Sequence, residues 1–242
     1  MFALVNAPAV AEASATDRQL PIYCVQRDQK MLAISFDAAW GNEDTQQLID
    51  ILGKYNVKAT FFVVGDWVDK YPESVKALHD AGHEVMNHSN SHAHMSQLSS
   101  EAIVADVEAC NDKIEAVTGV RPTLIRPPYG EYDNNVITSD PLHRDGSPSS
   151  GTWTVWSWKT LPAGEITERA GEPGPARVHR SLPQRRPSIP PRPLPAILET
   201  LLQEGYTFVP ISELILPGEY NVDYTIDHTG RQLPAQPSSS PR

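Results

Sequence analysis

The sequence predicts an α/β fold, a barrel of strands surrounded by helices, and three observations lead to this prediction. Short apolar runs alternate with amphipathic segments from Met31 onward, which is the pattern of repeated strand and helix units. The 242 residues are enough for one large core. Polar residues able to carry chemistry follow the expected strands, and such folds place their active sites at strand ends.

We expect one domain at residues 21–216. Residues 1–20 are interpreted as a flexible tail or a degenerate leader. The stretch MFALVNAPAVAEASA ends in small residues like a signal cleavage site, but it lacks a basic start and a long apolar core. Residues 217–242 are expected to be a C-terminal tail that ends in a disordered QPSSSPR.

Charge and hydropathy exclude two kinds of partner. The net charge of -10 argues against nucleic acid, because a polyanion needs a basic surface. No run of about 18 apolar residues is present, so no membrane span is expected in this chain. Cys24 and Cys110 could pair in an oxidising compartment, but two buried thiols are the favoured interpretation. We expect a monomer.

Each element is predicted from its period and its end signals. The expected strands are MLAISFDAA (31–39), ATFFVVG (59–65), HEVMNHS (83–89), TLIRPP (123–128) and YTFVPISELI (206–215, a strand and a turn). The expected helices are TQQLIDILGKYN (45–56), ESVKALHDAG (73–82, closed by Gly82), SSEAIVADVEACNDKIEAVTG (99–119, with a serine cap and a final glycine) and LPAILETLLQEG (194–205).

The pattern fails from about Ser139 to Pro193. Proline, serine and arginine dominate there, and only EITERA (165–170) resembles a helical fragment. A compact domain rarely carries a structureless insert of this length between regular units, so the segment is anomalous.

Three expected strand ends carry chemically useful residues: Asp37, then His88 and His92, then Arg126 and Tyr129. Neutral imidazoles four residues apart can share a zinc-like ion, although most such pairs are solvated or structural. A carboxylate beside that ion stays ionised and can take a proton from water, which makes Asp37 a candidate base; its alternative is a helix cap or an Asx turn. Arg126 could orient Asp37 through a bidentate pair, or form a structural salt bridge.

The motifs FD, HSxxH and RPPYG occur in this order, and with them the chain resembles the polysaccharide deacetylases of the NodB-homology type, carbohydrate esterase family 4. The resemblance covers Met31 to Thr138 and Leu194 to Leu214 and is greatest to the subgroup linked to spore-forming bacteria. It implies a distorted (β/α) barrel of seven to eight strands, incomplete around 139–193. It also implies a divalent metal, usually zinc, and removal of N-acetyl groups from peptidoglycan or chitin-like sugars at a bacterial cell or spore surface.

Carried over to this chain, the resemblance makes Asp37 the base that activates water, and His88 and His92 the metal ligands. Arg126 positions the base, and the backbone near Tyr129 helps to hold the oxyanion. The metal polarises the acetyl carbonyl.

The chain departs from the family pattern in two places. Ala38 stands where most members have an aspartate that is the third metal ligand, so metal affinity should fall; the spore-linked subgroup is similar to this chain in replacing that residue. The family's fourth motif, a strand ending in Asp-Trp, and its fifth, Leu-x-His, should both lie in the anomalous segment.

Synonymous codons offer an explanation for the segment. HRSLPQRR (179–186) can be encoded so that dropping one base gives IVLFHNA, a buried strand ending in Leu-x-His. DGSPSSGTWTVW (145–156) can be encoded so that a shift of two bases gives WVTIKWDVDSL, the expected fourth-motif strand. We interpret residues of about 139–157 and 171–193 as out-of-frame translation; a genuine proline-rich loop is the alternative.

If the chain is as written, we expect these segments to be unable to pair as strands, because proline donates no ladder hydrogen bond and arginine resists burial. His179 is given no catalytic role, and little or no activity is expected. Three functions compete: a metal-dependent sugar N-deacetylase, a carbohydrate-binding relative that has lost its chemistry, and an amidohydrolase acting on small cyclic amides. Barrel architecture alone does not choose among them.

Overall fold

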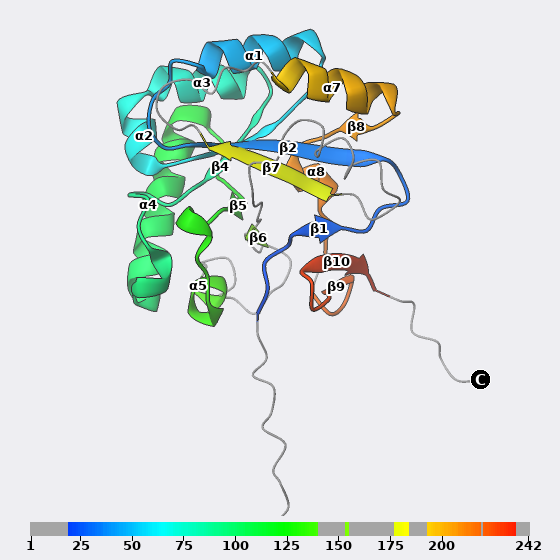
Figure 1. Cartoon of the computed structure of the whole chain (residues 1–242). Coiled ribbons are helices and arrows are strands. Elements are labelled where there is room, and N and C mark those ends of the chain that lie inside the picture. The colour runs from blue at the N-terminus through cyan, green and yellow to red at the C-terminus, as the bar shows by residue number, and fades with distance from the viewer. Residues whose placement is uncertain (1–18, 140–152, 155–176, 184–192, 219, 236–242) are drawn as a thin grey trace, which may run out of the picture.

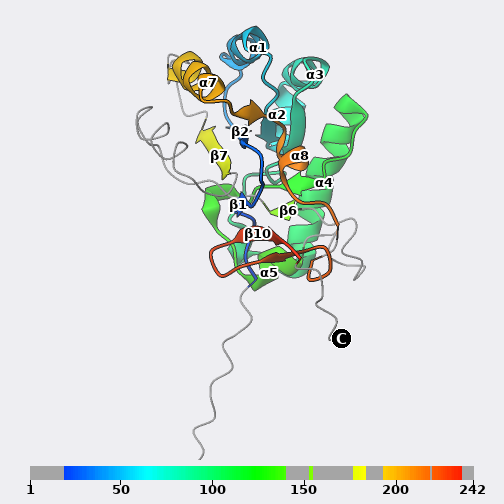
Figure 2. The ribbon, with the colours of Figure 1, turned by 90° about the vertical axis from the view of Figure 1, so that its right-hand side faces the viewer.

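The computed structural model describes residues 19–139, 153–154, 177–183, 193–218 and 220–235. The expected tail or leader at 1–20 lies almost wholly outside this range, as do EITERA, QPSSSPR and most of the anomalous segment. One sheet forms the centre of the molecule. Helices α1, α3 and α7 lie together on one side of it, and α5, β9 and β10 lie at the opposite end (Figures 1 and 2).

A run of parallel strands positions the candidate site. The strands follow one another in the order β6-β5-β4-β3-β2, and β2 to β5 are largely buried. Their bounds are β2 Met31–Ala38, β3 Thr60–Val63, β4 Glu84–Asn87, β5 Leu124–Ile125 and β6 Trp153–Thr154. The carboxyl ends of β2 to β5 therefore meet at one edge of the sheet, as the strand-end residues predicted.

The sheet continues on the other side of β2. The central strand β2 pairs in parallel with β7 and β8, and the path then runs from β7 to β1, β10 and β9. These strands are β7 Arg177–Pro183, β8 Thr207–Phe208, β1 Cys24–Val25, β9 Tyr224–Ile226 and β10 Arg231–Pro234. The described part of the chain thus has ten strands in one sheet, including several of two residues, where seven to eight strands were expected.

The four helices expected from periodicity are all present. They are α1 Thr45–Lys54, α3 Pro72–Asp80, α4 Ser100–Thr118 and α7 Pro193–Gln203. Three shorter helices, α2 Gly65–Lys70, α5 Asn134–Thr138 and α8 Ile211–Leu214, were not expected; α8 takes the place of the turn predicted after β8. Two 3-10 turns, η1 Met95–Gln97 and η2 Pro128–Gly130, complete the described helical elements.

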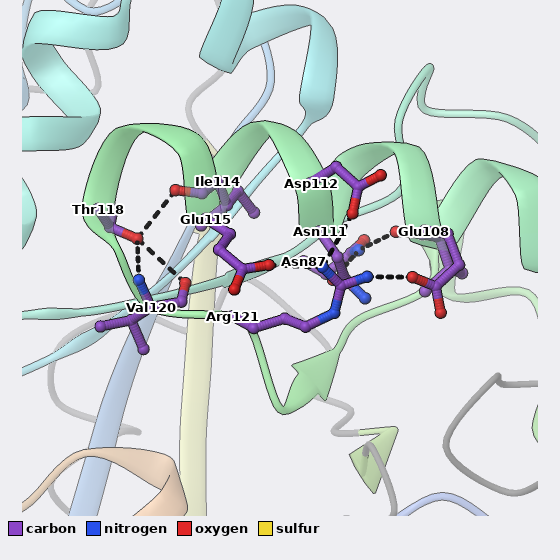
Figure 3. Close-up of polar contacts among 10 residues, drawn as sticks. Asn87, Glu108, Asn111, Asp112, Ile114, Glu115, Thr118, Val120 and Arg121 are labelled. Atoms are coloured by element: carbon purple, nitrogen blue, oxygen red, sulfur yellow. Dashed lines mark hydrogen bonds and ion pairs between the residues drawn. The ribbon is translucent and has the colours of Figure 1, made fainter.

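Helix α4 has the end signals that its sequence predicted. The Ser99 hydroxyl accepts a hydrogen bond from the Ala102 amide, and Gly119 adopts a φ of 75°, the left-handed conformation that closes helices. Beyond this end, Arg121 folds back onto the helix and pairs with three carboxylates of its exposed face: Glu108, Asp112 and Glu115 (Figure 3). The chain therefore enters β5 from a fixed direction.

The core surrounds β2, which explains why its sequence is apolar on both faces. Helices α1, α3, α4 and α7 cover one face of the sheet with a large cluster that includes Phe36, Phe61 and Trp67. A second cluster, with Phe62 and Ile211, lies on the other face. Strands buried on both sides read as continuous hydrophobic runs, as MLAISF does.

Two expectations about the chain beyond Thr138 need correction. The anomalous segment was expected to contain no residues able to pair, yet β7 pairs with β2 and β1, and β6 pairs with β5. Backbone groups make these ladders, so arginine-rich sequence does not prevent them. In addition, β9 and β10 lie beyond residue 216, within the range expected to be a tail. The domain boundaries themselves stay predictions.

The two cysteines form no disulfide with each other. Cys110 is buried in α4 and its thiol donates to the Val63 carbonyl at 3.5 Å, while Cys24 is half-buried in β1. Burial raises the pKa of the Cys110 thiol to about 12, so it stays protonated and unreactive. The interpretation of two thiols is confirmed for both residues, but only Cys110 is fully buried.

Candidate active site

Asp37 and Arg126 form an ion pair at the edge of the sheet where β2 and β5 end. Arg126 Nη1 donates to Asp37 Oδ1, and Nη2 donates to Ser35 Oγ at 2.9 Å. The side chain of Arg126 is 5% exposed and that of Asp37 is 16% exposed. The guanidinium also lies over the Phe62 ring, 4.0 Å from its centroid. The Asp37 carboxylate is therefore held in one direction, next to a fixed positive charge.

His88 follows β4 and is buried behind this pair. Its Nδ1 lies 2.6 Å from the Arg126 carbonyl oxygen. Because a carbonyl only accepts, Nδ1 carries the proton and Nε2 keeps a free lone pair. Burial lowers the pKa of His88, and the nearby Asp37 charge opposes this shift. His88 is thus a neutral imidazole in the tautomer that suits a metal ligand through Nε2.

His92 lies against His88, with 5.1 Å between the ring centroids. Burial, with a smaller contribution from the neighbouring His88, lowers the pKa of His92 to about 4. Its Nδ1 atom is one of the few buried side-chain polar atoms that have no hydrogen-bond partner among the described residues. Its φ of 56° is left-handed, which is uncommon for a residue with a side chain. A neutral, unpartnered imidazole in a strained loop indicates a place for a ligand.

The loop that carries the two histidines is fastened to α4. Asn87 Nδ2 donates to Asn111 Oδ1 at 2.7 Å (both labelled in Figure 3), and its Oδ1 accepts from the Ser89 amide. Asp106 accepts from the Asn90 amide at 2.8 Å and from Ser91 Oγ at 3.2 Å. Except for the exposed Ser91 bond, these bonds are buried or half-buried, so the loop geometry is set by helix α4 as well as by the strand before it.

Tyr129 completes the set of predicted residues. It lies in η2 with a φ of 59°, and its ring centroid lies 4.7 Å from that of His92 in an edge-on arrangement. Pro127 and Pro128 fix the chain before it. All five residues predicted from the sequence are therefore connected: Arg126 contacts Asp37 and His88, His88 contacts His92, and His92 contacts Tyr129.

The donor set fits a divalent metal only in part. His88 and His92 are neutral imidazoles of the kind that zinc prefers. However, no group of three or more His, Cys, Asp or Glu side chains is placed to hold a metal within the described part of the chain. Ala38, where a third ligand was expected to be missing, is buried at the end of β2 and packs in the core. Two imidazoles are thus the ligands that these residues offer.

Sequence reasoning missed residues that support the site, namely Ser35, Asp106 and Asn111, together with His94, which stacks on the Tyr129 ring, and Glu131, which contacts His94. Asn111 had a signal, because it is a polar residue on the buried stripe of α4 that also contains Val107 and Ile114. The other four residues had no signal in the sequence, since the residues that they contact lie far away along the chain.

Comparisons with known proteins identify the family. A family model described as polysaccharide deacetylase matches residues 25–140. A crystal structure of a mutant of BA3943, a CE4 family pseudoenzyme with restored enzymatic activity, superimposes with a TM-score of 0.68 at 30% identity, covering 81% of this chain and 71% of that one. The wild-type pseudoenzyme comes from Bacillus anthracis. The chain belongs to the polysaccharide deacetylases, carbohydrate esterase family 4.

Two curated relatives come from Bacillus subtilis. The chain is 32% identical over 193 residues to the peptidoglycan-N-acetylmuramic acid deacetylase PdaC, covering 78% of this chain and 40% of PdaC. It is 30% identical over 199 residues to the uncharacterised protein YlxY, covering 81% of this chain and 60% of YlxY. The chain thus spans less than two thirds of either relative. None of the helices within the described residues has the length and apolar character needed to cross a membrane.

Proposed function

We propose that the chain is a sugar N-deacetylase that hydrolyses N-acetyl groups on amino-sugar polymers of the peptidoglycan or chitin type, with low activity as written. The observation that carries the proposal is the arrangement of Asp37, fixed by Arg126, beside two neutral imidazoles. Amide hydrolysis needs a base for water, a group that stabilises the developing oxyanion and an acid for the leaving amine. We assign the first of these roles, the base, to Asp37.

Asp37 is the proposed base. Arg126 orients it, and Ser35 fixes the second guanidinium nitrogen, so that the carboxylate oxygen away from Arg126 can face a water molecule. His88 and His92 would hold a divalent metal, probed here as zinc, which when bound supplies a Lewis acid for the acetyl carbonyl. The backbone near Tyr129 is the proposed oxyanion donor.

Activity is expected to be low because two imidazoles hold a metal less firmly than two imidazoles and a carboxylate. Acetate release from an N-acetylglucosamine oligomer should therefore rise with added zinc and continue to rise at concentrations that saturate ordinary zinc enzymes. Asp37→Asn should abolish the release, because it removes the base while keeping the size of the side chain. No acetate at any zinc concentration would reject the proposed activity.

A second function is favoured by one observation. Because the described residues hold no group of three metal donors, the chain suits a carbohydrate-binding relative without chemistry. Metal analysis separates the hydrolase from the carbohydrate-binding relative. A carbohydrate-binding relative need retain no zinc after dialysis, and its affinity for the glycan should be the same with and without a chelator.

The place of action follows from the substrate. We propose that the chain works as a monomer at a bacterial cell or spore surface, as a domain of about residues 21–216. Relatives whose names state that they deacetylate peptidoglycan support the proposal.

A further inference from the structure

Two solvent-exposed aromatic side chains lie against His92. Trp40, in the loop after β2, is 58% exposed, and Tyr129 is 48% exposed. Their ring centroids lie 5.8 Å and 4.7 Å from that of His92. Single exposed apolar side chains are ordinary on protein surfaces. Two aromatic rings that share one neighbour inside a candidate active site instead indicate a surface that a ligand covers.

The loop that carries Trp40 is fixed although its indole is exposed. The buried Trp67 donates its indole N–H to the Gly41 carbonyl at 2.9 Å, and Asn42 Nδ2 donates to Ser74 Oγ at 3.0 Å. The Glu43 carboxylate lies over Gly41 in the same loop. Trp40 is thus presented on a rigid support, which reduces the entropy lost when a ligand binds.

The Tyr129 ring is held in a similar way. It stacks on the His94 imidazole with 4.0 Å between the centroids and an interplanar angle of 8°. His94 Nδ1 lies 2.9 Å from Glu131 Oε2, which also accepts from Ser96 Oγ at 3.2 Å. One face of the phenol is therefore covered by a braced imidazole, and His92 also contacts the ring, which leaves the residue 48% exposed.

We propose that Trp40 and the ring of Tyr129 form a stacking surface for a pyranose ring of the glycan, next to the two imidazoles. The proposal rests on the proposed function for the identity of the occupant. A pyranose presents a face of C–H groups that packs on the electron-rich face of an aromatic ring, while its hydroxyls bond to polar groups at the edge. Glu131, which contacts the His94 imidazole stacked on the Tyr129 ring, can supply such an acceptor.

The test uses the full chain treated with a chelator, so that binding is measured apart from chemistry. Isothermal titration with the tetramer of N-acetylglucosamine is compared for wild type, Trp40→Ala, Trp40→Phe and Tyr129→Asn. Asparagine tolerates the left-handed backbone of residue 129 while removing the ring. Trp40→Ala should weaken binding about tenfold and Tyr129→Asn by about fivefold, whereas Trp40→Phe should stay within about threefold of wild type.

Tyr220→Ala is the matched control. Tyr220 is an aromatic residue that is 40% exposed and stacks only loosely on Tyr224, in the part of the chain next to β9. Its replacement should leave tetramer binding unchanged. Equal loss of affinity in Trp40→Ala and Tyr220→Ala, or no loss in Trp40→Ala, would overturn the stacking surface, as would a wild-type chain that does not bind the tetramer.

These outcomes are distinct from those of the proposed function. Zinc-dependent acetate release by a wild-type chain whose affinity does not depend on Trp40 would overturn the surface and keep the hydrolase. Trp40-dependent binding without acetate release would keep the surface and reject the hydrolase.

Discussion

At the scale of single residues, the buried ion pair between Asp37 and Arg126 is the strongest interaction within the site. Arg126 is 5% exposed at its side chain, so without Asp37 it would be a buried charge with a weaker set of partners. Breaking a buried pair by removing one partner costs about 3–5 kcal/mol, whereas exposed pairs contribute about 0–1 kcal/mol.

Asp37→Asn should therefore lower the free energy of unfolding by about 2–4 kcal/mol in urea denaturation, besides removing the base. The control is Asp80→Asn, which breaks the exposed Lys76–Asp80 pair on α3, whose side chains are 63% and 56% exposed. This control should cost no more than about 0.5 kcal/mol. Similar costs for the two variants would show that the pair at the site contributes no more than a surface contact.

Residue 38 is the place to test whether a third ligand strengthens metal binding. Ala38 is buried among apolar neighbours, so Ala38→Asp should destabilise the metal-free chain by about 2–4 kcal/mol. Zinc should offset this loss and bind at least about tenfold more tightly than to wild type, because an anionic ligand joins the imidazoles. Thermal melting with and without zinc measures both effects.

Ala38→Asn separates charge from size in the same experiment. It should lower the melting temperature without zinc and gain little when zinc is added. If zinc stabilises both variants equally, a carboxylate at residue 38 does not act as a ligand.

At the scale of elements, the strands and helices that were predicted are those with long apolar periods. The helix α4 and the strand β2 could be read from the sequence because each has many buried positions and clear ends. Helix α2 and strands β1 and β6 could not, since two to six residues are too few to show a period. They form because neighbouring elements supply their partners.

The same reasoning explains which part of the site could be predicted. Asp37, His88 and Arg126 were found because polar residues directly after apolar strands are conspicuous. Trp40 and Asp106 were not singled out, because their roles depend on contacts with His92 and with the loop after β4 that no local pattern encodes.

The residues that precede β3 and β4 form a pH-sensitive hydrogen bond. His83 Nδ1 accepts from the Ala59 amide at 3.2 Å. Burial, with a smaller contribution from the Lys58 charge, lowers the pKa of His83 to about 4. The unfolded chain binds a proton on this residue near pH 6.5, before the folded chain does, so the stability that His83 contributes is present above pH 6.5 and is lost as the pH falls towards 4.

The free energy of unfolding should therefore fall between pH 7 and pH 4.5 in wild type. In His83→Asn this fall should be smaller by about 2 kcal/mol. Asparagine keeps an acceptor for the Ala59 amide but does not titrate. An unchanged difference would assign the acid sensitivity to other groups. Comparing the two chains removes the contributions of His88 and His92, which both share.

At the scale of the whole molecule, β7 joins two parts of the sheet. On one side lies the parallel run from β2 to β6 that carries the site, and on the other lie β1, β10 and β9. Its position in the anomalous segment makes it the best place to test whether that segment is a genuine part of the fold. The out-of-frame interpretation stays a prediction, which the coding DNA tests directly.

Val178→Pro should destabilise the chain by about 3 kcal/mol or more, because Val178 pairs with Ala33 of β2 and proline removes an amide hydrogen from the ladder. Val178→Thr keeps both the amide and the branched shape, so its cost should be much smaller. Urea denaturation measures both. An unaltered midpoint for the proline variant would mean that residues 177–183 do not pair with β2 in solution.

The pairing of β1 with β10 places the first and last described strands side by side. Tyr23 N–H donates to the Gly230 carbonyl at 2.8 Å, and Gln26 N–H donates to the Gln232 carbonyl at 2.9 Å. A chain shortened at residue 216 would leave β1 with an unsatisfied row of amides and carbonyls, which is a template for self-association. A protein truncated after residue 216 should therefore aggregate when expressed, whereas a protein that extends through residue 235 should stay in solution.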